Sequence, residues 1–284
     1  METLKELGNK LHGDKRERMG KMWGHRRCNQ DPALLLSYLI IKHNIKITPN
    51  QVTYIFVLLS VAASILIFFS GFWLKIISIF LLWICLVLDG VDGDLARYYN
   101  NFSLKGLYVD GVYHLIVPAL FLFALAYNIS QSSLLNPDLI LLAGFFGGLS
   151  WTLLKSNGQL PFHLCCKYYL KKPTIWKVKN NEVSESIVNE KILKHGLIRK
   201  VLSIRFQIRQ FFIAMIIIVL SLIIEKIFFV SPELYPLTSY VIVIYGAFLT
   251  LHLVEEVLKA ISYVEKVIAR LGKDYIKDDQ HDRL

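Results

Sequence analysis

Charged and small residues alternate at the end of an otherwise apolar stretch, residues 86–97, which reads LVLDGVDGDLAR. Ionisable side chains inside a hydrophobic segment are unfavourable to bury, and they usually mark a functional site. If the stretch is helical, one of its faces carries Asp89, Asp92, Gly93, Ala96 and Arg97. Carboxylates three residues apart can share a hard divalent cation, small residues let a ligand approach the backbone, and an arginine can bind two phosphate oxygens. The pattern therefore predicts a site for a metal-bound diphosphate.

A second group follows at helical spacing, because Gly106, Asp110 and His114 stand four residues apart. They would form one stripe on the next helix, and Asp110 and His114 could then complete the metal cluster. Two cations about 4 Å apart can stabilise the entering and leaving oxygens of a displacement at phosphorus. Asp94 lies about 140° around the helix from Asp89, so we expect a cap or a solvent-exposed residue there, not a ligand.

The bulk composition predicts a membrane protein. The chain has 284 residues, of which 54% are hydrophobic, and its mean hydropathy is +0.45; average soluble domains are less apolar. The net charge of +10 is typical of lysines and arginines gathered in cytoplasmic loops and near anionic lipid, so we expect no nucleic-acid partner. The four cysteines show no C-x-x-C spacing and predict neither a disulfide framework nor a zinc site.

We expect an all-α polytopic bundle with six transmembrane helices, because several apolar runs approach the roughly 20 residues that cross a bilayer. The runs cover residues 51–70, 75–97, 106–127, 138–156, 207–230 and 236–262. A shorter apolar stretch at 32–45 predicts an N-terminal interfacial helix. The expected organisation is a cytosolic segment at 1–31, a membrane domain at 32–262 with a cytosolic insert at 157–206, and a cytosolic tail at 263–284.

The distribution of lysine and arginine predicts the orientation. Residues 1–46 contain ten of them and residues 155–209 contain twelve, whereas 128–137 and 231–236 contain none. We therefore expect both termini, the insert and the aspartate cluster on the cytoplasmic side of a multi-pass membrane protein. An even number of spans agrees with this orientation.

The stretch 89–114 resembles the signature of the CDP-alcohol phosphatidyltransferase family, which reads D-x-x-D-G-x-x-A-R, eight residues, G, three residues, D, three residues, D. At these spacings the chain supplies Asp89, Asp92, Gly93, Ala96, Arg97, Gly106 and Asp110. The sequence Thr48-Pro49-Asn50 before the first span also looks like this family. The resemblance extends over roughly residues 32–265.

The resemblance implies a membrane bundle, usually a homodimer among membrane lipids, that moves a phospho-alcohol group from a CDP-alcohol to an acceptor hydroxyl and releases CMP. It implies a pair of Mg²⁺ or Mn²⁺ ions held by Asp89, Asp92 and Asp110. The residues implied in binding the CDP-alcohol are Gly93, Ala96, Arg97, Ser103 and Gly106. The last acid of the signature would serve both as a metal ligand and as the base that deprotonates the acceptor.

That last acid is replaced in this chain by His114. A neutral imidazole can accept a proton near pH 7, and it can ligate a metal through one nitrogen. Three interpretations are open: His114 is the base or a ligand, another residue is the base, or the chain is a catalytically degenerate scaffold of the same fold. An ion transporter is a fourth, but transport sites stand near the midplane on broken helices, whereas these acids stand at the cytosolic end.

Three basic residues stand near the cytosolic ends of the fourth and fifth spans: Lys155, Arg205 and Arg209. Anchoring on the cytoplasmic side accounts for all three. The alternative is that they contact a phosphate of the acceptor or of the donor.

Overall fold

The computed structural model describes residues 3–12, 26–69, 71–157, 210–228 and 235–275, and all regular elements in these ranges are helical. Two short helices come first, α1 (Leu4–His12) and α3 (Asp31–Lys42), and a π-helical turn η1 (Arg26–Gln30) leads into α3. The longer helices are α4 (Pro49–Leu66), α5 (Phe72–Tyr98), α6 (Leu104–Ser130), α7 (Pro137–Asn157), α10 (Phe211–Phe228) and α11 (Pro236–Tyr275). The predicted all-α fold is confirmed.

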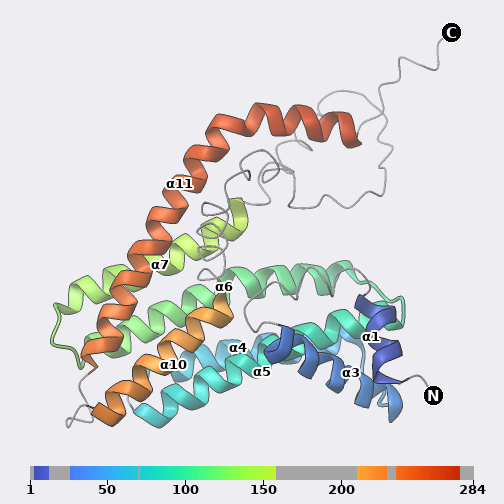
Figure 1. Ribbon diagram of the computed structural model, residues 1–284, viewed down its shortest axis with the longest axis horizontal. Helices are drawn as coiled ribbons and strands as arrows, with labels where there is room; N and C mark the ends of the chain where they lie inside the picture. Colours follow the sequence, from blue (N-terminus) through green and yellow to red (C-terminus); the bar gives the residue numbers. More distant parts are fainter. Residues whose placement is uncertain (1–2, 13–25, 70, 158–209, 229–234, 276–284) are drawn as a thin grey trace.

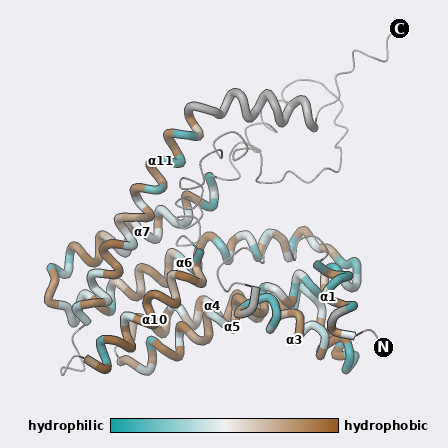
Figure 2. Tube along the Cα trace, viewed as in Figure 1, coloured by the Kyte–Doolittle hydropathy of each residue, from teal (hydrophilic) through white to brown (hydrophobic). Residues whose placement is uncertain are grey.

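Six of these helices are long and apolar enough to cross a membrane: α4, α5, α6, α7, α10 and the Pro236–Ile261 part of α11. They coincide with the six predicted spans, and hydrophobic residues dominate along them (Figure 2). The stretch predicted as an interfacial helix forms α3. The predicted insert lies outside the described residues apart from Asn157, and α11 continues to Tyr275 across the boundary expected at 262.

The helices that position the site meet at one end of the bundle. α4 packs against both α5 and α6, and α3 lies on α5; α6 packs on α7, α7 on α11, and α10 contacts α11 and α5 (Figure 1). Small residues let α7 approach closely, because Gly148 faces the backbone of Ala119 in α6 and Gly147 faces Gly246 in α11. α5 ends and α6 begins at the same end, separated only by residues 99–103.

Two helix caps define this end of the bundle. α4 begins in a capping box, in which Thr48 Oγ1 accepts a hydrogen bond from the Gln51 N–H at 3.3 Å and Gln51 Oε1 accepts one from the Thr48 N–H at 2.8 Å. α6 begins at Ser103, whose Oγ accepts a hydrogen bond from the Gly106 N–H at 3.3 Å. Between α5 and α6 the chain turns at Asn100, which has a φ of 48°. Both helix starts are therefore fixed beside the signature residues.

Buried charges close the opposite end, and the sequence analysis did not identify them. Lys75 of α5 is 1% exposed, and its Nζ lies 4.3 Å from the centroid of the Tyr235 ring. Glu225 of α10 is also buried, and its carboxylate accepts hydrogen bonds from the N–H and the Oγ1 of Thr238, at 2.7 and 2.5 Å. Since buried charges need partners, this cluster ties α5, α10 and the start of α11 together.

α1 is an amphipathic helix within the predicted cytosolic segment at 1–31, where the sequence analysis identifies no helix. Its buried side chains, Leu7 and Leu11, stand one helical turn apart and form a small cluster with Leu34, Tyr38, Ile41 and Tyr98. Tyr98 is the last residue of α5. α1 therefore packs on α3 and on the end of α5 that carries the signature. The four-residue spacing of Leu7 and Leu11 is the sequence feature that could have predicted this helix.

Candidate metal and phosphate site

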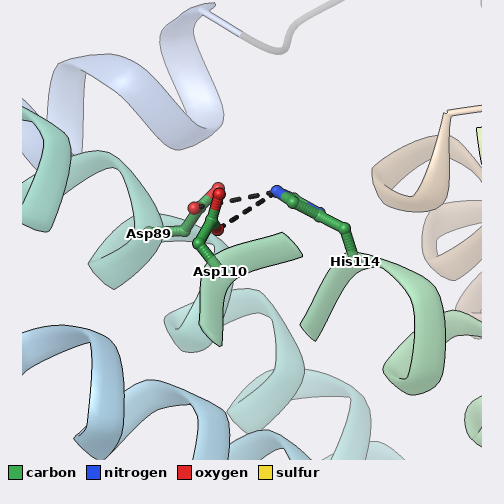
Figure 3. A group of neighbouring side chains, drawn as sticks. All are labelled: Asp89, Asp110 and His114. Carbon is green, nitrogen blue, oxygen red and sulfur yellow. Dashed lines mark ion pairs between the residues drawn. The ribbon is translucent and has the colours of Figure 1, made fainter. Parts of the chain in front are cut away.

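Three side chains from two helices point toward one another: Asp89 of α5 and Asp110 and His114 of α6 (Figure 3). His114 Nε2 lies 3.4 Å from Asp110 Oδ1 and 3.9 Å from Asp89 Oδ1. One donor atom from each residue fits within a group whose members lie no more than 4.8 Å apart. The predicted stripe of Asp110 and His114 is thus present, and it faces the first aspartate of the signature.

This group is suited to hold a divalent cation. Carboxylate oxygens are the ligands that Mg²⁺ and Mn²⁺ prefer, and an imidazole nitrogen is a common transition-metal ligand. Asp110 Oδ1 is buried and accepts no hydrogen bond from a described residue, an arrangement that is unfavourable for a carboxylate unless a cation or a donor compensates it. A cation would also offset the repulsion between Asp89 and Asp110. The residues present therefore fit the metal that the signature implies.

Asp92, which the sequence predicts as a further ligand, lies outside this group of three. Its Oδ2 accepts a hydrogen bond from Thr53 of α4, with 2.5 Å between the two oxygens. Thr53 Oγ1 is also 3.1 Å from the Pro49 carbonyl oxygen. α4 thus holds the carboxylate of Asp92, and its role as a ligand stays a prediction.

The signature face of α5 is open, as the sequence predicts. Asp89, Asp92, Gly93, Ala96 and Arg97 are all partly exposed. The Arg97 guanidinium lies over Gly93, where an added Cβ would meet its Nη2 at 3.4 Å. Arg97 Nε is buried and donates to no described residue. A charged group with an unused donor, next to a position without a side chain, can receive a phosphate.

The prediction for Asp94 is wrong in one respect. It points away from the ligand face, as expected, but it is 1% exposed and so is not a solvent residue. Its Oδ1 lies 2.7 Å from Arg97 Nη2 and 3.3 Å from His12 Nε2, and its Oδ2 accepts a hydrogen bond from Ser37 Oγ at 3.3 Å. The periodicity could not show this, because α1 and α3 cover this side of α5.

Ser103 and Gly106 have structural roles at the start of α6. Ser103 caps the helix as described above, and Gly106 faces α4, where an added Cβ would stand 2.5 Å from Asn50 Oδ1. A side chain at position 106 would therefore push α4 and α6 apart. Donor contacts by these two residues remain predictions.

Of the three basic residues, only Lys155 belongs to the described part of the chain. It is exposed near the end of α7, and its charge acts on both Asp89 and His114. A phosphate contact by Lys155 stays a prediction. Arg205 and Arg209 lie outside the described residues.

Two site residues escaped the sequence analysis although each left a signal. Thr53 is a polar residue within the apolar run of α4, and it bonds Asp92. Gly90 stands inside the signature of α5, and a Cβ there would come within 2.7 Å of the Ala33 Cβ. Gly90 therefore lets α3 pack directly behind the site.

A family model matches the part of the chain that contains the site helices. Residues 46–158 match the model described as CDP-alcohol phosphatidyltransferase. This agrees with the family resemblance predicted from the signature, over a stretch shorter than residues 32–265. The matched residues contain α4, α5, α6 and α7, and with them Asp89, Asp110 and His114.

A curated relative agrees with this match. The bifunctional IPC transferase and DIPP synthase of Thermococcus kodakarensis is 34% identical to this chain over 102 residues. The alignment covers 36% of this chain and 22% of the relative, so the chain spans about a fifth of that protein's length. The likeness therefore concerns a shared segment.

Proposed function

We propose that the chain is a divalent-metal-dependent enzyme that transfers a phospho-alcohol group from a CDP-alcohol to an acceptor hydroxyl and releases CMP. The observation that carries the proposal is the group formed by Asp89, Asp110 and His114, within the residues that match the family model. The reaction would belong to the synthesis of phospholipids or related phosphodiesters. We also propose that the protein works as a homodimer in the membrane.

In the proposed reaction, the acceptor oxygen forms a bond to the phosphorus that carries the donor's alcohol, and the bond between that phosphorus and the CMP oxygen breaks. The acceptor proton passes to His114 Nε2, and CMP leaves with the bonding electron pair. A pair of Mg²⁺ or Mn²⁺ ions held by Asp89, Asp92 and Asp110 would polarise the phosphoryl group; if His114 Nε2 ligates one of these ions instead, another residue must take the proton. Arg97 binds and orients the diphosphate through its guanidinium.

The position of His114 supports an active enzyme over a degenerate scaffold. Its Nε2 stands within 3.9 Å of both carboxylates, as expected for a residue that has taken over the place of the missing acid. In a protein that had lost its activity, position 114 would not need a side chain that can bind a metal or accept a proton. This position supports the proposal that His114 supplies the ligand or base of the signature.

The nucleotide has room next to the same elements. A hollow of about 640 Å³ lies between the α3–α4 and α5–α6 connections, lined by residues 44–49 and 99–101. Pockets for small ligands have volumes of about 300–1,000 Å³. We propose that this hollow, two residues beyond Arg97, receives the cytidine part of the donor.

The proposal is tested by offering the purified protein a panel of CDP-alcohols, including diacylglycerol, ether-lipid and small-polyol donors, with a matching panel of acceptor hydroxyls. Mass spectrometry should detect CMP and one new phosphodiester in equal amounts. If no donor yields CMP, the degenerate-scaffold interpretation replaces the proposal. The Thermococcus kodakarensis relative suggests starting with the substrates of its two activities.

Arg97→Lys should raise the donor KM by about tenfold or more. Lysine keeps the positive charge but loses the planar fork that binds two phosphate oxygens. The measurement is the initial rate of CMP release against donor concentration. Lys226→Arg, an exchange of the same two residue types at the exposed end of α10, is the matched control, and an unchanged donor KM in Arg97→Lys would exclude the proposed contact.

The proposed orientation places the α5–α6 connection in the cytoplasm and the α6–α7 connection on the other side. In a variant without native cysteines, we expect Gln131→Cys to react with an impermeant maleimide from the outside of right-side-out vesicles. Asn101→Cys should react only after permeabilisation. Labelling of Gln131→Cys from the cytoplasmic face alone would reverse the topology.

A further inference from the structure

The buried carboxylate of Asp94 lies behind the proposed donor-binding face of α5. The signature does not specify the residue at this position. Both oxygens of Asp94 are engaged, Oδ1 by Arg97 Nη2 and Oδ2 by Ser37 Oγ; His12 Nε2 lies 3.3 Å from Oδ1 but makes no hydrogen bond with a described residue. A carboxylate that is only 1% exposed is unfavourable unless it is paired and hydrogen-bonded. Its partners come from α1, α3 and α5, so three elements fix this one group.

Asp94 determines how Arg97 lies. The distance of 2.7 Å between Arg97 Nη2 and Asp94 Oδ1 is that of a charge-assisted hydrogen bond. It draws the guanidinium back along the helix, over Gly93. Nε, on the same edge of the guanidinium group as Nη2, is buried and donates to no described residue. Arg97 is thus held by one nitrogen and retains another donor for a ligand.

Asp94 is itself held from behind. Ser37 Oγ lies 2.8 Å from the Ala33 carbonyl oxygen and 3.3 Å from Asp94 Oδ2, so its single hydroxyl proton is shared between these two acceptors. α3 comes close enough for this contact because Gly90 leaves room for Ala33. His12 is brought to Asp94 by α1, whose leucines pack on α3 and α5. Two helices outside the membrane spans, α1 and α3, are thereby connected through Asp94 to Arg97, the arginine proposed to bind the CDP-alcohol.

We infer that Asp94 is a positioning residue for the donor diphosphate: it orients the Arg97 guanidinium toward the site and is held by Ser37, with His12 packed beside it. The inference rests on the proposed function, because Arg97 is assigned there to the diphosphate. It adds residues that lie behind Arg97, namely Asp94, Ser37 and His12, and none of them is a fixed position of the signature. An arginine that is already oriented loses less freedom when it binds a phosphate.

Asp94→Asn tests the inference, because asparagine keeps the shape but not the charge. We expect the donor KM to rise about tenfold to a hundredfold, the range for loss of a hydrogen bond to a charged group, while kcat and the acceptor KM change by less than about threefold. In an Arg97→Lys background the same change should have little further effect on the donor KM, because partners in one network are not additive. Glu225→Gln removes a buried carboxylate at the opposite end and should leave the donor KM unchanged.

The outcomes are distinguishable. If the wild type neither releases CMP nor binds a CDP-alcohol, the proposed function is overturned, and the inference falls with it. If the wild type is active and Asp94→Asn leaves the donor KM unchanged, or acts equally in both backgrounds, the inference alone is overturned. If Asp94→Asn does not fold, Ser37→Ala decides: removal of one hydrogen bond should raise the donor KM about threefold to tenfold, and an unchanged value overturns the inference.

Discussion

Asp110→Asn should lower CMP release by about three orders of magnitude or more, and Asp89→Asn should do the same. Each change keeps the size of the side chain but removes a charge that would hold the cation. A bound cation contributes several kcal/mol of transition-state stabilisation, and each 1.4 kcal/mol corresponds to about a tenfold change in rate. Asp110 should be the more sensitive position, because its buried Oδ1 has no hydrogen bond from a described residue to replace a metal.

The same variants can be followed without activity. Electron paramagnetic resonance of Mn²⁺ should show tight binding to the wild type and weakened binding to Asp89→Asn and Asp110→Asn. Asp138→Asn, on the exposed first turn of α7 at the other end of the bundle, is the matched control and should bind Mn²⁺ normally. Equal Mn²⁺ affinity in all four proteins would place the metal elsewhere.

His114→Ala should lower turnover by about two to four orders of magnitude, the range for loss of general acid–base catalysis with some loss of metal binding. The donor KM should change little, because Arg97 and the open position at Gly93 remain. His114→Asp restores the acid of the family signature, and we expect it to retain or recover activity with a changed pH profile or metal preference. His43→Ala, an exposed histidine after α3, is the control.

The two His114 variants separate the interpretations left open by the sequence. Normal turnover by His114→Ala would assign the base to another residue. If His114→Ala and His114→Asp are both inactive while the wild type works, the imidazole itself is needed. If the wild type and His114→Asp release no CMP from any donor, the chain is a degenerate scaffold.

The residues of one helix face were predictable because their periodicity is local. The spacing of Asp110 and His114, and the shared face of Asp89 and Arg97, follow from the helical repeat alone. The meeting of Asp89 with Asp110 and His114 across two helices could be expected from the family signature, and the structure places His114 Nε2 within 3.9 Å of both carboxylates. The six spans followed from apolar length, which the bilayer imposes on every such helix.

What escaped prediction depends on contacts between distant segments. The sequence predicts a cap or a solvent-exposed residue at Asp94, because nothing in residues 86–97 shows that α1 and α3 cover it. Lys75 opens the second span and resembles an interfacial anchor, but α10 and Tyr235 bury it. The hydrogen bond from Thr53 to Asp92 joins residues 39 positions apart. Such pairings are fixed by packing rather than by spacing.

The most direct measurement is CMP release by the purified protein from a CDP-alcohol, followed while Mg²⁺ or Mn²⁺ is added back after excess chelator. We expect no release in chelator, saturable recovery with added metal, and no recovery in Asp110→Asn over the range of metal that restores the wild type. Full CMP release in excess chelator, or equal release by Asp110→Asn, would contradict the assignment of Asp89, Asp110 and His114 as a metal-dependent catalytic site.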